Sequence, residues 1–130
     1  MRENQTEQQL FNFERLEVWA RAVELAGNVY VLTRAFPADE RFGLTNQMRR
    51  AAVSVSSNVA EGASRSSRVD FARFVEVAAG SLYELVSQAI IAKREGWLTE
   101  EAHEQLRSDA ANISRMLSGL RKSLTQGGPP

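Results

Sequence analysis

The sequence contains no cysteine, which excludes disulfide bonds, thiolate metal sites and thiol nucleophiles and is typical of a reducing compartment. No apolar run approaches the roughly 20 residues that span a bilayer, and the polar residues 1–10 lack the apolar stretch of a secretory signal. A net charge of one sign is also absent, because 16 basic residues balance 16 acidic ones. We therefore expect a soluble, cytoplasmic protein whose overall charge indicates neither a membrane nor a nucleic-acid partner.

Few prolines and glycines interrupt the chain, and they divide it into four segments with apolar residues at helical spacing. Pro37 stops the first segment, and Gly62 and Gly96 indicate the ends of the second and third. Ser67 and Thr99 are suited to cap the starts of the third and fourth, because their hydroxyls accept hydrogen bonds from free amide groups there. We predict helices at residues 14–36, 44–62, 67–95 and 100–124.

Short connections between these helices indicate how they pack. Loops of a few residues join neighbouring helices antiparallel, and no segment has the alternation of apolar and polar residues that is typical of strands. We therefore predict an all-α fold, an antiparallel up-down-up-down four-helix bundle, in one domain at residues 1–125. Residues 126–130, rich in glycine and proline, should form a disordered tail.

The predicted helices differ in how much of their circumference is apolar. The fourth carries one narrow apolar stripe, whereas the first and third are apolar much further round than the roughly 100° that a bundle core requires. Either these two helices are more central, or the excess surface packs against another subunit. We predict a homo-oligomer, with Trp19 or Tyr83 as the aromatic anchor of its interface.

Small and polar residues form a stripe on the second helix that should face a similar stripe on the third. Antiparallel pairing about the turn after Gly62 makes the numbers of facing residues sum to about 130. In this register Glu84 should form an ion pair with Arg49 or Arg50, and Gly80 should let the backbones approach closely. The predicted polar seam comprises Arg49, Arg50, Asn58, Glu61 and Glu84. It is either a satisfied network that sets the register or a site that binds a ligand directly.

Few residues suit catalysis. Glu100 and His103 match one half of the di-metal motif of helical bundles, but His103 is the only histidine and lies one position past the apolar stripe, where we expect it to be solvated. No glycine-rich loop of the kind that binds phosphates occurs, and no serine lies in a nucleophile elbow. We expect a protein that is not an enzyme and that binds no metal or cofactor.

Charge is distributed unevenly although its sum is zero. Residues 44–74 carry five basic and two acidic side chains, a net charge of +3, and residues 111–130 carry three basic and no acidic ones, again +3. The predicted topology brings the turn between the second and third helices to the same end of the bundle as the end of the fourth. Arg65 or Arg68 should lie beside Glu61 there. We predict that nucleic-acid phosphates bind Arg65, Arg68, Arg115, Arg121 and Lys122.

Several segments resemble one bacterial family. The most specific is the stretch from Arg41 to Gly62, RFGLTNQMRRAAVSVSSNVAEG. Supporting segments are Phe13–Trp19, Gly80–Leu85 and Gly96–Leu98. Over residues 11–124 the chain resembles the four-helix-bundle proteins encoded by intervening sequences of 23S ribosomal RNA genes. Ser56 departs from the family's pattern, since relatives commonly have proline there, and this predicts a straighter second helix.

The resemblance implies a homopentamer without enzymatic activity. It also implies similarity to the accessory proteins of diversity-generating retroelements, which bind nucleic acid and a reverse transcriptase. Two hypotheses follow: the chain is an oligomeric accessory factor associated with nucleic acid, RNA in particular, or it is a protein-interaction scaffold without a nucleic-acid role. An adjacent reverse transcriptase gene or ribosomal RNA gene would favour the first.

Overall fold

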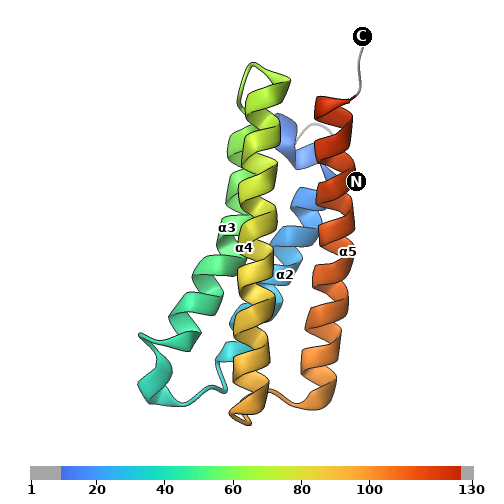
Figure 1. Cartoon of the computed structure of the whole chain (residues 1–130). Helices are drawn as coiled ribbons and strands as arrows, with labels where there is room; N and C mark the ends of the chain where they lie inside the picture. The colour runs from blue at the N-terminus through green and yellow to red at the C-terminus, as the bar shows by residue number, and fades with distance from the viewer. Residues whose placement is uncertain (1–9, 127–130) are drawn as a thin grey trace, which may run out of the picture.

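The computed structural model describes residues 10–126, and within them it contains helices and no strands, which confirms the all-α prediction (Figure 1). The elements are two short 3-10 helices, η1 (Asn12–Arg15) and η2 (Ala38–Glu40), and four long helices, α2 (Glu17–Thr33), α3 (Leu44–Ala63), α4 (Arg68–Arg94) and α5 (Glu100–Thr125). Of the tail predicted at residues 126–130, only Gln126 lies inside the described residues.

The four long helices run alternately up and down, and each packs against two neighbours (Figure 1). Sequential helices contact each other, and α2 closes the ring by packing against α5. The most extensive contact joins α3 to α4, whereas α2 does not pack against α4 or α3 against α5. The chain is therefore a square four-helix bundle. The largest fully buried side chains of its core are those of Met48, Leu82, Leu85, Leu106 and Leu117.

The first long helix is shorter than the sequence predicts. Leu16 has an extended backbone (φ −82°, ψ 120°), which separates η1 from α2. At the other end the helix stops at Thr33, whose hydroxyl donates a hydrogen bond to the Val29 carbonyl at 2.7 Å. Residues before Pro37 turn out of the helix, because the proline ring disfavours helical geometry at the preceding position. This turn buries Phe36 at one end of the core.

The predicted helix starts are confirmed by the capping bonds. The Ser67 hydroxyl accepts a hydrogen bond from the Asp70 amide at 3.0 Å, and the Thr99 hydroxyl accepts one from the Ala102 amide at 3.1 Å. Each bond satisfies an amide that has no partner inside its own helix. These starts depend on residues three positions apart, so the sequence specifies them locally.

Gly96 ends α4 as predicted, with a left-handed backbone at φ +85°. Its amide donates to the Lys93 carbonyl and the Trp97 amide donates to the Ala92 carbonyl, both at 2.9 Å. This pair of bonds is the Schellman motif, and glycine favours it because a Cβ atom is strained at positive φ.

The end of α3 lies one residue beyond the predicted one, but the prediction that Gly62 terminates the helix through its backbone is wrong. The helix continues to Ala63, and Gly62 is buried against α4. A Cβ atom on Gly62 would lie 2.7 Å from the Cβ of Phe74 and 2.8 Å from Cδ1 of Phe71. The glycine is therefore required by close helix packing and not by backbone conformation. The helix also passes without interruption through Ser56, whose hydroxyl bonds back to the Val53 carbonyl at 3.1 Å.

The helix α4 has more apolar residues than its buried side can use. It is the one described helix whose length and mean hydropathy would suffice to cross a bilayer, and only 33% of its most apolar 18 residues are buried in the bundle. Core helices of water-soluble bundles meet the same criteria. The buried residues of α4 pack against α3 and α5, and its other apolar residues are exposed.

Candidate functional site

The turn before α4 and the end of α5 meet at one end of the bundle, as the topology predicts. The guanidinium of Arg68 donates to the Ser123 carbonyl, and its Nε donates to the Leu124 carbonyl at 3.4 Å. These carbonyls belong to the last turn of α5, where no intrahelical donor remains. Arg68 therefore caps α5, and two of its five N–H groups are used inside the protein.

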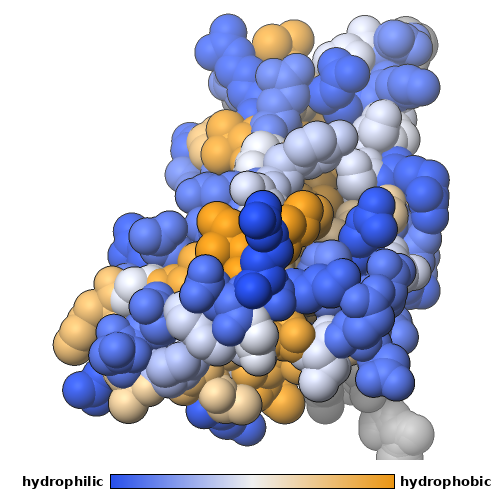
Figure 2. Space-filling model, turned by 60° about the horizontal axis from the view of Figure 1, so that its bottom comes forward, coloured by the Kyte–Doolittle hydropathy of each residue, from blue (hydrophilic) through white to orange (hydrophobic). Residues whose placement is uncertain are grey.

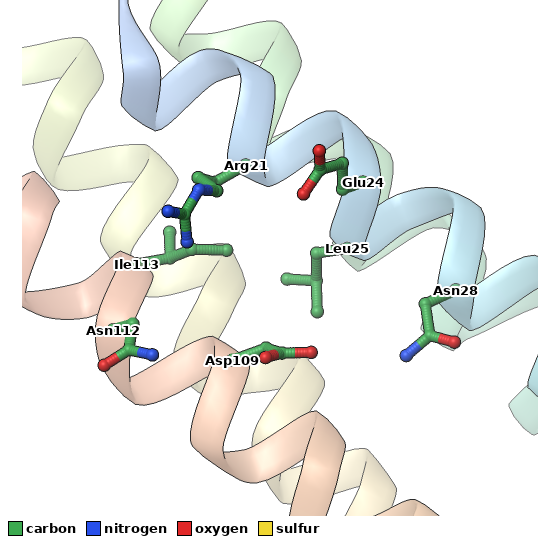
Figure 3. Close-up of a pocket in the computed structure, with 7 residues that line it drawn as sticks. All are labelled: Arg21, Glu24, Leu25, Asn28, Asp109, Asn112 and Ile113. Carbon is green, nitrogen blue, oxygen red and sulfur yellow. The ribbon is translucent and has the colours of Figure 1, made fainter.

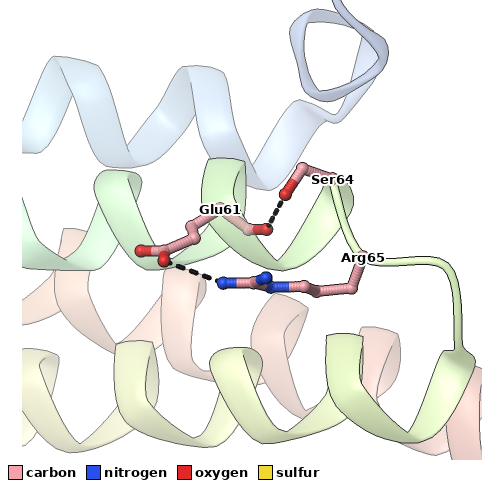
Figure 4. A network of polar contacts seen from close by, with 3 residues as sticks. All are labelled: Glu61, Ser64 and Arg65. Atoms are coloured by element: carbon pink, nitrogen blue, oxygen red, sulfur yellow. Dashed lines mark hydrogen bonds and ion pairs between the residues drawn. The ribbon is translucent and has the colours of Figure 1, made fainter.

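Arg65 at the same end is paired with Glu61, which confirms that predicted contact. The ion pair measures 3.0 Å (Figure 4). The Arg65 guanidinium also lies 4.7 Å from the centre of the Phe74 ring. Ser64 continues this network by donating its hydroxyl to the Glu61 carbonyl at 2.6 Å (Figure 4). Both charged side chains are exposed, so the pair adds little stability, but Glu61 compensates the charge of Arg65.

The remaining predicted phosphate-binding residues lie along α5. Arg121 pairs with Glu76 of α4 at 3.7 Å, and Arg115 donates to the side chain of Asn112. Lys122 is exposed, with no carboxylate of residues 10–126 within 4.0 Å. Two of the five cations are thus paired with carboxylates: Arg65 with Glu61, which the +3 of residues 44–74 already includes, and Arg121 with Glu76, which lies outside both segments.

The predicted ion pair of Glu84 with Arg49 or Arg50 is wrong. Glu84 is exposed, and its carboxylate accepts a hydrogen bond from the Gln88 amide at 3.4 Å. Arg49 points to α2 instead, where its Nε donates to the Thr33 hydroxyl at 2.9 Å. The helices are therefore paired in a different register from the one predicted.

Two contacts across α3 and α4 define this register. The Ser54 and Ser81 hydroxyls lie 2.8 Å apart, and the Gln88 amide lies 3.5 Å from the Gln47 side-chain oxygen. The residue numbers of both pairs sum to 135, whereas the prediction used about 130. The predicted contact of Gly80 is wrong as well, because Gly80 is exposed and has no neighbouring atoms within 4 Å of a Cβ position.

The seam that does form is small and mostly neutral. Asn58 donates to the Ser54 carbonyl at 2.8 Å and to its hydroxyl at 2.9 Å, so it stays on its own helix. The Ser54–Ser81 contact then links the two helices. The seam therefore contains no charged residue. Arg49 and Arg50 instead line a groove on the α2 side of α3.

This groove, which we call the arginine groove, has a volume of about 490 Å³. It is lined by Tyr30, Asn46, Arg49, Arg50, Val53 and Ser54. Arg49 is held in place by Thr33 and by the Tyr30 ring, whose centre lies 4.6 Å from the guanidinium. Arg50 is exposed beside it, and none of the lining residues is acidic.

A second groove of about 490 Å³ lies between α4 and α5, and we call it the apolar groove. Tyr83 is 71% exposed there, next to the half-buried Val86 and the 43% exposed Ile90. On α5 it is lined by small residues, with Arg107 and Arg115 at its margin. Figure 2 shows apolar surface reaching solvent between hydrophilic side chains at the end of the molecule that carries the α4–α5 connection.

Trp19, the other predicted interface anchor, lies against its own chain. Its ring is half-buried on the core and meets the Phe13 ring edge-on, with 5.0 Å between the ring centres. Tyr83 is therefore the more accessible of the two aromatic residues.

A small polar pocket separates α2 from α5 (Figure 3). It has a volume of about 110 Å³ and is lined by Arg21, Glu24, Leu25, Asn28, Asp109, Asn112 and Ile113. Arg21 already pairs with Glu17 at 3.2 Å, and Asp109 accepts a hydrogen bond from Gln105 at 3.0 Å. Among the described residues, Arg21 is the one charged side chain of this pocket that forms an ion pair.

The prediction that His103 is solvated is wrong. Its side chain is 6% exposed, and neither ring nitrogen has a hydrogen-bond partner among the described residues. His103 occupies the same stripe as Leu106 and Ala110, spaced three and seven residues further on, and this spacing could have predicted its burial. Within residues 10–126 no three His, Cys, Asp or Glu side chains are grouped as a metal site would need.

Comparison with known proteins adds a fold relative and a family. A solved protein of unknown function from the S23 ribosomal protein family of Bacteroides thetaiotaomicron superposes with a TM-score of 0.75. It is 23% identical, and the match covers 81% of this chain and 95% of that one, so it supports the fold. No curated protein matches the sequence. The model of the 23S rRNA-intervening sequence proteins matches residues 14–119, and the chain therefore belongs to that family.

Proposed function

We propose that this chain is a non-enzymatic bundle protein that associates with copies of itself and serves as an interaction scaffold in the cytoplasm. The observation that carries the proposal is the exposure of Tyr83, 71%, within the apolar groove. A large aromatic side chain on an apolar surface of this kind is typical of an interface centre. We propose a second copy as the occupant, because the same chain also exposes apolar residues on another helix, α2.

The distribution of apolar residues favours a head-to-tail contact. The apolar groove lies on α4 and α5, whereas Val23 and Val31, each more than 40% exposed, lie on α2. Two different apolar surfaces on one molecule fit a heterologous interface, which closes into a ring when the rotation between copies allows it. The pentamer implied by the resemblance is the ring size we propose.

Light scattering on the full chain tests this proposal. The parent protein should have a mass near five times 14.5 kDa, and Tyr83→Ser should shift it toward 14.5 kDa with helicity unchanged. Phe42→Ser is the matched control, because Phe42 is 84% exposed in the connection before α3, away from the groove. A monomeric parent at micromolar concentration would contradict self-association, and a Tyr83→Ser variant that stays assembled would place the contact elsewhere.

Association with nucleic acid is the second candidate function. It is supported by the convergence of Arg65, Arg68, Arg121 and Lys122 at one end of the bundle, which rotational symmetry would repeat in an oligomer. RNA is the nucleic acid we propose, and the resemblance to retroelement accessory proteins makes a reverse transcriptase the protein partner to test. The pairing of Arg65 and Arg121 with carboxylates is the reason why we rank this function second.

A gel-shift series against structured RNA across a salt gradient tests the second candidate. Arg65→Gln with Lys122→Gln is the informative variant, because Arg68 also caps α5 and its loss would disturb the fold. The double variant should weaken RNA binding and lower the slope of log affinity against log salt by about 2. Unchanged binding by the double variant would exclude this surface as the RNA site. If the parent binds no RNA at low salt, only the scaffold function remains as a proposal.

A further inference from the structure

Arg49 is fixed in the arginine groove without help from any acidic residue. Its Nε donates to the Thr33 hydroxyl at 2.9 Å, and one terminal nitrogen lies 3.5 Å from the Tyr30 carbonyl. Thr33 is 3% exposed, and its own hydroxyl donates to the Val29 carbonyl at 2.7 Å, so this support is rigid. Since a guanidinium has five N–H groups, three remain to donate to a ligand.

The positive charge of this groove is not compensated by the described residues. Neither Arg49 nor Arg50 has a carboxylate of residues 10–126 within 4.0 Å, and every other lining side chain is neutral. Glu84, the acid that the sequence predicted to pair with these arginines, accepts a hydrogen bond from Gln88 of its own helix. Arg49 and Arg50 therefore both line a groove that has no acidic residue in its walls.

The size of the groove indicates what else the ligand carries. One water occupies about 30 Å³ of liquid, so a groove of about 490 Å³ holds much more than a single anionic group. Its walls include the Tyr30 ring and the Val53 side chain, which is 40% exposed. A ligand with an anion at one end and a flat or apolar body at the other fits this arrangement.

We propose that the arginine groove binds the phosphate group of a nucleotide unit, with Arg49 and Arg50 as the phosphate ligands. A phosphate monoester carries up to two negative charges and three terminal oxygens, which suit two forked guanidinium groups better than the single charge of a carboxylate. The Asn46 amide adds a further donor, and the apolar wall receives the sugar or base. The phosphate belongs either to a free nucleotide or to a nucleic-acid backbone. The inference does not depend on self-association.

Titration calorimetry with the full chain tests this site at low salt, with three probes: AMP, adenosine, and a twelve-nucleotide single-stranded RNA. Arg50→Gln is the main variant, because Arg50 is exposed and the fold does not depend on it. Arg94→Gln is the matched control, since it removes the same charge from an exposed position in the last turn of α4 outside the groove. Arg49→Lys keeps the charge and removes the fork.

Binding of AMP that is at least tenfold tighter than binding of adenosine, and at least tenfold weaker in Arg50→Gln, would support a site for a free nucleotide. Binding of the RNA alone, with the same loss in Arg50→Gln and a salt slope lower by about 1, would support a backbone phosphate. Arg49→Lys should lose affinity in either case, and Arg94→Gln should bind as the parent does. The proposal is overturned if neither AMP nor RNA binds, or if Arg94→Gln loses as much affinity as Arg50→Gln.

Discussion

The two arginine-rich regions of this bundle contain the same side chain in opposite circumstances. At the end formed by the turn before α4 and the end of α5, Arg65 and Arg121 are paired with carboxylates and Arg68 caps a helix. In the arginine groove, Arg49 is held by a hydroxyl, a carbonyl and an aromatic ring, all of them uncharged. The first region contains more cations, but two of them lie beside carboxylates. The second contains two cations and no acidic residue.

The difference between the two regions is decided by which helices lie next to each arginine. Glu61 is one helical turn before Arg65, and Glu76 reaches Arg121 from the adjacent helix. No such acid reaches Arg49, because its side chain turns to Thr33 and Tyr30 of α2 whereas Glu84 bonds to Gln88 on its own helix. Counting charges along segments therefore does not show which arginines lie beside a carboxylate.

The largest expected effect comes from the residue that sets the register. Gly62→Ala places a Cβ atom 2.7 Å from that of Phe74, and neither backbone can move without opening the α3–α4 contact. We expect a loss of about 2–3 kcal/mol in the free energy of unfolding, measured by urea denaturation. Gly80→Ala is the control, because nothing lies within 4 Å of its Cβ position, and it should be neutral or stabilising. Equal losses in both variants would contradict the packing role of Gly62.

His103 extends the comparison to a polar group that lacks partners. Its ring is buried with both nitrogens unbonded among the described residues, which costs stability at neutral pH. We expect His103→Leu to raise the free energy of unfolding by about 1 kcal/mol, as judged by chemical denaturation at pH 7.5. A destabilised variant would mean that the imidazole has a bonding partner in solution.

Arg68 should matter to the fold more than the other cations at its end of the bundle. Arg68→Gln removes the bonds to the Ser123 and Leu124 carbonyls, and we expect a loss of about 1 kcal/mol. Hydrogen exchange should show faster exchange in the last turn of α5. An exchange pattern identical to that of the parent would show that this cap is not formed in solution.

Arg65 tests the other side of the same comparison. Its pair with Glu61 is exposed, so Arg65→Gln should change the free energy of unfolding by less than about 0.5 kcal/mol. The double variant with Glu61→Gln gives the coupling energy directly. A coupling energy well above 1 kcal/mol would indicate that this end is less solvated than its exposure suggests.

The smallest effect is expected from the pair of Glu100 with Lys93, which lie 2.6 Å apart. The hydrogen bond from Lys93, with the charge of that residue, lowers the pKa of Glu100 below its ordinary value of 4.5. The pair therefore stabilises the fold at pH values above 4.5, the ordinary pKa of the group. Its contribution is lost as the pH falls through the lowered pKa of Glu100. Glu100→Gln should slightly lower Tm at pH 7 and leave it unchanged at pH 2, as calorimetry would record.

The sequence by itself determined the features that depend on residues within one turn of each other. Apolar periodicity indicated four helices, Ser67 and Thr99 identified two helix starts, and Gly96 identified a helix end. The sequence also predicted the pair of Glu61 with Arg65, because a spacing of four residues places both side chains on one face of a helix. Each of these contacts is complete inside a single element or its cap.

Only the tertiary structure decided how the helices are offset and rotated against one another. The packing of Gly62 on Phe71 and Phe74 sets a register about five residues from the one that loop length predicts. Arg49 and Glu84 are separated by the direction in which each side chain leaves its helix, because Arg49 turns to Thr33 and Tyr30 of α2. The register could not be predicted from single residues, because the position of one helix along another depends on how whole side-chain surfaces interdigitate.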